Sequence, residues 1–536
     1  SGIDISNCDA TAAAATITSA INDGNGSSGS DAGTAVHGVT ATDALDGAGN
    51  INLSFAGGAT AGDVAAYVSG SGSSSSSGRS SSSLITTPQK VGSEFQVNTH
   101  TTGDQAFADI ASLNDGGFVT VWHDVSGQDG HYTGTFGQRY DSAGSKLNSE
   151  FQINTHTQWG QAYPSVTSLS DGGFVATWSS YSQDGAYGKW GVYGQIFDSS
   201  GATKGSEFLI NTHTGGDQRK TAVASLSDGG FVVTWESHGQ DSDGIGIYGQ
   251  RYSSAGSTAG QEFLVNTEIS GDQAHGSLTG LAGGGFVVTW ASKGQDGSGW
   301  GVYGQRFNES GVVNGAEFQI NTTTNGNQGV HETYNTAGMN TWNNPVVESL
   351  TNGGFVVAWT SENQDGDRYG VFGQIYAPDG SSVGSEFLIN TEVSADQYMP
   401  AIASLSNGGF VVTWAGTEDH GGYDHDIFAQ VFQADGSKIG EEFQVNTFDE
   451  SNPSNGQQTS PAVATLHDGK LVFIWNTTIH DGDGYGVFAQ IFDTGTSSSS
   501  GSSSGSSSTT TGSSSSSNSS SSGPTLDSPS NAMAAI

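Results

Sequence analysis

Aspartate residues occur in pairs at alternate positions in three glycine-containing segments of the chain. Carboxylate oxygens two residues apart on a bent loop can converge on Ca²⁺, so the pairs predict calcium as a cofactor. The complete spacing of an EF-hand loop is missing, and solvated turn residues are the alternative. The predicted calcium ligands are Asp241 with Asp243, Asp365 with Asp367, and Asp481 with Asp483.

A second candidate metal site is the segment 419–426, which could hold a transition metal. Its candidate ligands are Asp419, His420, Asp424, His425 and Asp426. Histidines on exposed loops mostly bind no metal, so an ordinary surface loop is the alternative.

Catalytic motifs are missing from the sequence. We find no nucleophile elbow, no metalloprotease histidine pair, no phosphate loop and no dinucleotide fingerprint. Two carboxylates from distant segments could act as the acid and nucleophile of a glycosidase, but no pair stands out among the 53 acidic residues. We therefore predict that the chain is not an enzyme.

A six-residue sequence motif that occurs seven times predicts the strands that must position these residues. Its first copy, Glu94 to Thr99, reads EFQVNT. Further copies follow at intervals of 55–57 residues, with one interval of 69. Repeats of roughly this length are typical of propellers and solenoids. The later copies begin at Glu150, Glu207, Glu262, Glu317, Glu386 and Glu442.

Each copy predicts four short strands joined as an antiparallel meander. A small-residue segment such as 224–226 leads through a hairpin turn, Asp228 to Gly230, into an aromatic strand such as 231–235. A loop containing Gln-Asp-Gly then precedes an alternating strand such as 192–197. Helical spacing is absent. We predict an all-β, seven-bladed propeller of four-stranded antiparallel blades flanked by Ser/Gly-rich arms, with a solenoid as the alternative.

The strand order places the small-residue strand at the axis and the Glu-Phe strand at the rim. The first Glu-Phe strand, 94–99, then has no blade of its own. We expect it to pair with the strand around 487–492, because closing the ring removes exposed sheet edges.

One tryptophan stands at the same place in every repeat, and sevenfold equivalence favours packing between blades over a ligand cage. These structural residues are Trp122, Trp178, Trp235, Trp290, Trp359, Trp414 and Trp475.

In such a meander, the Gln-Asp-Gly loop and the link from a rim strand to the next axial strand emerge on one face. The interval of 69 residues lengthens one link over 324–344, so we expect any binding site on this face. The candidate ligand-binding residues are His331, Tyr334 and Trp342 of that link, and Trp190 and Trp300, which we expect to be exposed.

The repeated Glu-Phe-Gln-Val-Asn-Thr, Asp-Gly-Gly-Phe-Val-Val-Thr-Trp and Gln-Asp-Gly sequences resemble repeats of large secreted bacterial surface proteins, over about residues 92–493. Such proteins often also carry haemolysin-type calcium-binding nonapeptides, which are absent from this sequence. The resemblance implies an extracellular or cell-surface location.

Serine, glycine and threonine dominate 69–84 and 497–522, a composition typical of flexible linkers and suitable for O-glycosylation. The terminal segments carry apolar patches that favour docking between subunits, with a small autonomous cap and an inactive tail as the alternative. The predicted parts are an N-terminal segment at 1–68, a linker at 69–91, the propeller at 92–496, a Ser-rich linker at 497–522 and a tail at 523–536.

The formal net charge of −39 would repel phosphate backbones, so we expect no nucleic-acid partner. No run of about 18 apolar residues predicts a transmembrane segment. Cys8 is the single cysteine, which excludes an intramolecular disulfide. We predict a non-enzymatic structural subunit whose propeller is linked by its arms, through self-association or a cell-surface partner, into a fibre, sheath or surface layer. The alternative is a calcium-dependent adhesin that binds glycans.

Overall fold

A computed structural model describes residues 39–45, 51–55, 87–329, 333–334, 340–341, 345–417, 425–447, 457–478 and 480–495. The chain divides into two compact units, Ser1–Ser82 and Ser83–Ile536. In the first unit, β1 (Val39–Leu45) pairs antiparallel with β2 (Ile51–Phe55). Within the described ranges, no helix is long and apolar enough to cross a membrane.

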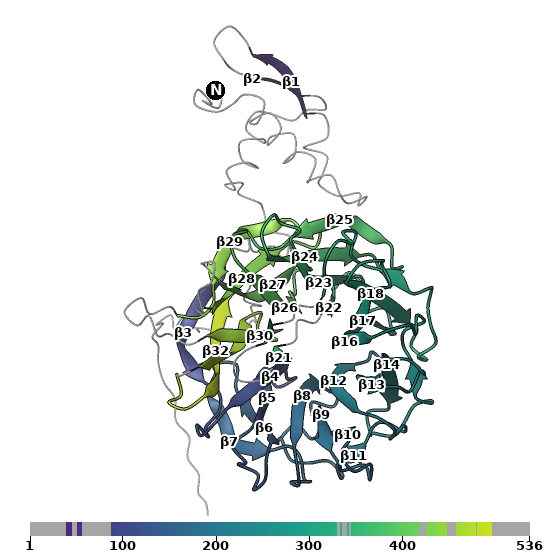
Figure 1. The fold of residues 1–536 in the computed structure, drawn as a ribbon. Coiled ribbons are helices and arrows are strands. Elements are labelled where there is room, and N and C mark those ends of the chain that lie inside the picture. The colour runs from purple at the N-terminus through teal and green to yellow at the C-terminus, as the bar shows by residue number, and fades with distance from the viewer. Residues whose placement is uncertain are drawn as a thin grey trace, which may run out of the picture. The chain divides into compact units, whose positions relative to one another are not determined.

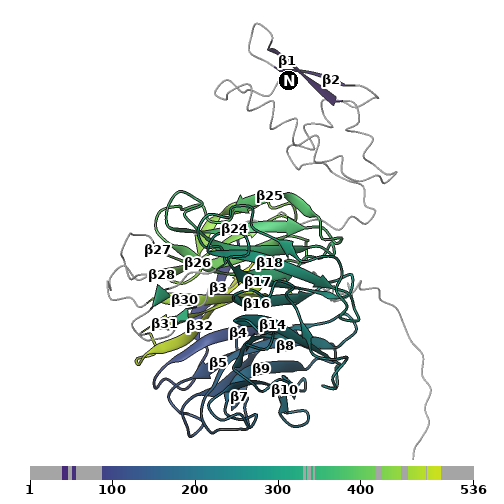
Figure 2. The ribbon, with the colours of Figure 1, turned by 45° about the vertical axis from the view of Figure 1, so that its right-hand side comes forward.

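The second unit contains a ring of seven four-stranded antiparallel sheets (Figure 1). In six of these blades, strands that follow one another in the chain lie side by side from the axis to the rim, as β8, β9 and β10 do in Figure 2. The predicted all-β, seven-bladed propeller is confirmed, and the solenoid alternative is wrong.

The strands of the first four blades are β4 (Gln105–Ser112), β5 (Phe118–Asp124), β6 (Gly134–Tyr140) and β7 (Lys146–Gln152); β8 (Gln161–Ser168), β9 (Phe174–Tyr181), β10 (Trp190–Phe197) and β11 (Phe208–Leu209); β12 (Gln218–Ser225), β13 (Phe231–His238), β14 (Ile245–Tyr252) and β15 (Phe263–Leu264); and β16 (Gln273–Gly280), β17 (Phe286–Lys293), β18 (Trp300–Phe307) and β19 (Phe318–Gln319).

The remaining blades consist of β22 (Val346–Ser349), β23 (Phe355–Glu362), β24 (Tyr369–Tyr376) and β25 (Ser382–Leu388); β26 (Gln397–Ser404), β27 (Phe410–Thr417), β28 (His425–Phe432) and β29 (Lys438–Gln444); and β30 (Gln458–Thr465), β31 (Leu471–Thr478), β32 (Tyr485–Asp493) and β3 (Gln89–Gln96). The long link before β22 contains a pair of antiparallel strands of two residues each, β20 (Thr333–Tyr334) and β21 (Asn340–Thr341).

The ring closes by pairing the two ends of the propeller. Strand β3 is the outer strand of the last blade, with Phe95 opposite Ala489 and Gln96 opposite Phe488 of β32. The predicted closure is confirmed. Strand β3 begins at Gln89, a little before the predicted domain start at 92.

The glutamate of each copy of the repeated motif joins two neighbouring blades. Glu150 Oε2 accepts the backbone N–H of Thr99 at 2.6 Å, and Glu150 Oε1 accepts the side-chain amide of Gln128 at 2.7 Å. The Glu-to-Thr contact recurs around the ring, and Glu94 completes it by accepting the N–H of Thr447 at 2.9 Å. Charge-assisted hydrogen bonds of this kind are stronger than neutral ones, so the repeated motif connects the blades as well as forming strands. The other contacts join Glu207 to Thr155, Glu262 to Thr212, Glu317 to Thr267, Glu386 to Thr322 and Glu442 to Thr391.

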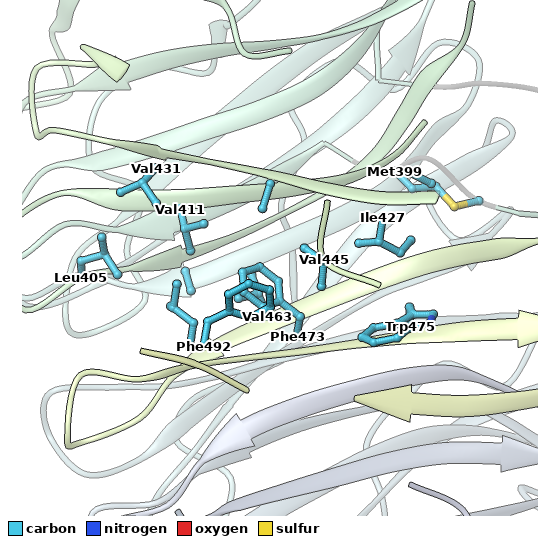
Figure 3. Close-up of a cluster of buried hydrophobic side chains, with 14 of the residues drawn as sticks. Met399, Leu405, Val411, Ile427, Val431, Val445, Val463, Phe473, Trp475 and Phe492 are labelled. Atoms are coloured by element: carbon cyan, nitrogen blue, oxygen red, sulfur yellow. The ribbon is translucent and has the colours of Figure 1, made fainter. Parts of the chain in front are cut away.

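The seven repeated tryptophans lie in the hydrophobic clusters between blades, and each is at most 1% exposed. Figure 3 shows one cluster, in which Trp475 of the last blade lies below Ile427 of the blade before it, and to which Val411 of that blade also belongs. Trp122 of the first blade packs in turn with Val472 of the last. The core is therefore a series of interfaces around the ring, and closure completes it.

Candidate functional site

The loop between the second and third strands of a blade contacts the link that enters the next blade. Asp243 Oδ2 accepts the N–H of Gly271 at 3.0 Å, and Asp367 Oδ2 accepts that of Ala395 at 3.0 Å. These loops and links share one face of the propeller, as the sequence predicted, and we call it the long-loop face.

The predicted calcium ligands lie in these loops of the long-loop face. In each pair, the second aspartate binds the next link, as Asp483 also does with the N–H of Gly103 at 3.2 Å. Burial raises the pKa of the first aspartates, Asp241, Asp365 and Asp481. In the part of the chain that the structure describes, no group of three or more His, Cys, Asp or Glu residues could hold a metal ion. The calcium site stays a prediction.

Several predicted site residues lie outside the described residues. These are His331 and Trp342 of the long link and Asp419, His420 and Asp424 of the predicted transition-metal loop, while Tyr334 is described only as backbone in β20.

The two described members of that loop have protein partners. The Nδ1 atom of His425 hydrogen-bonds the Tyr398 hydroxyl, and burial lowers the pKa of His425 to about 4. Asp426 Oδ1 accepts the side-chain amide of Asn446 at 2.7 Å.

The expected exposure of Trp300 is wrong. Only 8% of its surface is accessible, because it packs against Ala274 and Ala291, and the ammonium group of Lys293 lies 5.5 Å from the centre of its ring. Trp300 therefore offers no open face for a ligand. Trp190, at the equivalent place in β10, is half-buried and not fully exposed as expected, and it belongs to a different group of side chains.

Five aromatic residues gather where the first two blades meet on the long-loop face, and we call them the aromatic platform. Tyr187 is 84% exposed and Tyr132 is 64% exposed. The Tyr132 and Trp159 rings are nearly parallel, at 8°, with their centroids 6.2 Å apart. The Trp159 ring also contacts the His131 ring of the first blade, at 5.6 Å between centroids, and the rings of Tyr181 and Tyr187 of the second blade. The platform consists of Tyr132, Trp159, Tyr181, Tyr187 and Trp190.

Trp159 occupies a backbone position that favours glycine. Its φ is +67°, and the corresponding residues of most other described links are glycines at +66° to +88°. The left-handed conformation costs an L-residue about 1–2 kcal/mol. A bulky residue here departs from the repeat at a cost to stability. The corresponding residues are Gly103, Gly216, Gly271, Gly326 and Ala395.

Two neighbours accommodate the Trp159 ring and its backbone. The Trp159 N–H donates to Nδ1 of His131 at 2.9 Å, so the neutral imidazole carries its own proton on Nε2. Gly160 follows, where most other described links have an aspartate, and a Cβ there would lie 3.5 Å from the Trp190 ring. Sequence reasoning missed this site, although Trp159-Gly160 in place of Gly-Asp is visible once the links are aligned.

No protein-family model matches the chain, and no curated protein matches it. Solved structures match at the level of the fold. An α-L-arabinofuranosidase of Fusarium graminearum is 12% identical, with 75% of this chain and 98% of that chain covered and a TM-score of 0.41. An α-L-arabinanase of Penicillium chrysogenum complexed with arabinobiose is 11% identical (76% and 100% covered, TM-score 0.40). The NanB sialidase of Streptococcus pneumoniae is 8% identical (74% and 70% covered, TM-score 0.40).

The comparison contradicts our prediction that the chain is not an enzyme, because those propellers are glycosidases and a sialidase. The physical reason is that a propeller can bring catalytic carboxylates together from separate blades without any contiguous motif. Missing motifs were therefore insufficient grounds for excluding catalysis. Similarity at this level concerns the fold alone.

Proposed function

We propose that this protein binds carbohydrate through the aromatic platform on its long-loop face. The observation that carries the proposal is Trp159, a bulky aromatic residue in a left-handed position where most other links have glycine. Strained residues gather at functional sites because the surrounding structure tolerates a cost that a ligand site requires.

The exposed rings suit a sugar. The C–H bonds of a pyranose form an apolar face that can lie against an indole or phenol, and Tyr and Trp supply large contact areas at a small cost in conformational entropy. Tyr132 and Tyr187 expose most of their surface, and Trp159 lies between them.

Polar groups beside the rings suit the hydroxyl groups of a sugar. His131 is exposed, and its Nε2–H remains a donor while Nδ1 accepts the N–H of Trp159. Gln158 and Lys189 are exposed and adjoin platform residues in the sequence. Rings combined with nearby donors favour a polyhydroxylated ligand over a purely apolar one.

The other predicted roles remain predictions. Self-association into a fibre, sheath or layer rests on the terminal segments, of which only the β1–β2 hairpin is described. An extracellular location, O-glycosylation and calcium dependence of glycan binding likewise rest on the sequence.

The test is a glycan array probed with the full chain, with Ca²⁺ or with EDTA, followed by titration of the best ligand. Trp159→Gly restores the residue of most other described links, so it should fold normally and yet bind about tenfold more weakly or worse, as expected on losing a stacked ring. Trp190→Ala should weaken binding too.

Trp300→Ala is the matched control, since Trp300 stands at the same place in another blade but is buried. It should lower stability without changing glycan affinity. Native affinity in folded Trp159→Gly and Trp190→Ala proteins would refute the platform as the site, and an array without any bound glycan would refute the function.

A further inference from the structure

The axial strands of the seven blades surround a cavity of about 300 Å³. Strands β4, β8, β12, β16, β22, β26 and β30 all contribute to its lining (Figure 1). The cavity shares no lining residue with the aromatic platform.

In six of the seven blades, one position of the axial strand supplies a different side chain to the cavity. In six axial strands, the register against the second strand shifts at the same place, and the residue at the shift has φ of +51° to +62°. L-residues other than Asn, Asp and His seldom adopt this conformation. The strand is otherwise repetitive, but this position holds Phe107, Tyr163, Lys220, His275, Met399 and Ser460, all of which line the cavity.

The third and fourth blades place a charged group at one side of the cavity. Glu236 of β13 is 1% exposed, and its Oε1 accepts Lys220 Nζ at 3.1 Å and the N–H of His275 at 2.9 Å. Arg219 Nε lies 3.8 Å from Glu236 Oε2. Burial works to raise the pKa of Glu236, but attraction by Lys220 and its neighbours outweighs burial and holds this pKa below its ordinary value.

The charges of this group do not cancel. Arg219 and Lys220 supply two positive charges and Glu236 one negative charge, in a chain whose formal net charge is −39. The Lys220 side chain keeps 13% of its surface accessible. Asp109 also lines the cavity, where its Oδ2 accepts the Ser165 hydroxyl and the Val166 N–H, both at 2.9 Å. Burial outweighs these hydrogen bonds and raises the pKa of Asp109, which favours its neutral form over that of an exposed aspartate.

The fifth to seventh blades contribute an apolar side, to which Val346, Met399, Pro400 and Pro461 belong. A cavity of about 150 Å³ can hold a benzene ring, so this one has room for a ring and a carboxylate.

We propose that the propeller channel binds a small organic carboxylate, whose negative group lies at Lys220 and whose apolar body lies against Met399 and Pro461. The site is separate from the carbohydrate platform and does not depend on it. Aromatic side chains from the first two blades, Phe107 and Tyr163, complete the lining.

Isothermal titration of the full chain with phenylacetate at pH 7 tests the proposal, with benzyl alcohol as the neutral counterpart. Phenylacetate should bind saturably, and benzyl alcohol roughly tenfold more weakly or worse, because charge-assisted bonds are stronger than neutral ones. Trp159→Gly, which alters only the platform, should bind phenylacetate normally.

Lys220→Met alone would leave Glu236 buried without its lysine, so the variant to use is Lys220→Met/Glu236→Gln. It should fold and lose phenylacetate. Met399→Trp fills the apolar side, leaves the charged group intact and should also abolish binding. Native affinity in both folded variants, or no saturable binding to the native chain up to about 10 mM, a limit near the weakest specific affinities, overturns the proposal.

Discussion

Glu348 is a buried carboxyl group where the repeat places a small residue. It lies in β22, and its Oε1 accepts the Ser404 hydroxyl at 2.8 Å and the Ser404 N–H at 3.4 Å. The equivalent residue in four other blades is alanine, as in Ala224 and Ala403. Burial, against the effect of these hydrogen bonds, raises the pKa of Glu348 to about 7. The folded protein therefore holds a proton on Glu348 at pH values where the unfolded chain has released it.

The raised pKa fixes the sign and size of a pH effect on stability. A folded-state pKa above the unfolded value favours folding most fully below the unfolded pKa, and the advantage is lost as pH rises to the folded pKa. With an ordinary value of 4.5 and a folded value of about 7, the lost contribution is about 3 kcal/mol, at 1.36 kcal/mol per pKa unit. The free energy of unfolding of Glu348→Ala, taken relative to that of the native chain, should therefore rise by about 3 kcal/mol as the pH increases from 4 to 8.

Urea unfolding of both proteins across this pH range measures the effect. The other carboxyl groups titrate alike in both, so the difference between the two free energies of unfolding isolates Glu348. Glu348→Gln keeps the shape of the side chain and should show the same pH trend as Glu348→Ala. A difference that stays constant to within about 0.5 kcal/mol, the usual error of such comparisons, would refute a buried protonated Glu348.

Three other predictions concern the core, the acidic loops and the channel. Trp290→Ala should lower the free energy of unfolding by about 3–5 kcal/mol because it empties a blade interface, whereas Tyr187→Ser should change it by less than about 0.5 kcal/mol; urea midpoints compare them. Asp243→Ala removes the acceptor of the Gly271 N–H and should cost about 1 kcal/mol equally in Ca²⁺ and in EDTA. A cost that appeared only with Ca²⁺ would instead assign Asp243 to a metal site. Burial lowers the pKa of Lys220 to about 8, so phenylacetate affinity in calorimetry should fall as pH rises above 8, and a flat profile to pH 9 would contradict a role for its charge.

The fold was predictable because its determinants are local and repeated. The Asp228 to Gly230 turn has positive φ at Gly229, the repeated tryptophans are buried, and the strand at 94–99 had no blade of its own until the ring closed. Seven copies of the same local pattern leave few architectures open, and each copy gives the same indication.

The sites were less predictable because they depend on contacts between blades. His275 donates its N–H to a carboxylate 39 residues earlier, and Lys220, which lies at the register shift in β12, donates to the same group. Trp190 and Trp300 look equivalent in sequence, yet packing against Ala274 and Ala291 buries the second. Spacing along a chain cannot show such differences, since they arise where two blades meet.

Departures from the repeat therefore deserve a physical explanation of their own. Trp159 in place of glycine and Glu348 in place of alanine are each unfavourable locally, and either could revert to the repeated residue without disturbing the ring. The Glu-to-Thr contacts and the buried tryptophans are what the fold needs, and every blade already has them. An unfavourable residue that the fold does not require points to a requirement outside the fold. Such residues occur on the platform and along the axial strands, which is why we assign ligands to those two places and not to the acidic loops, whose second aspartates bind the next link.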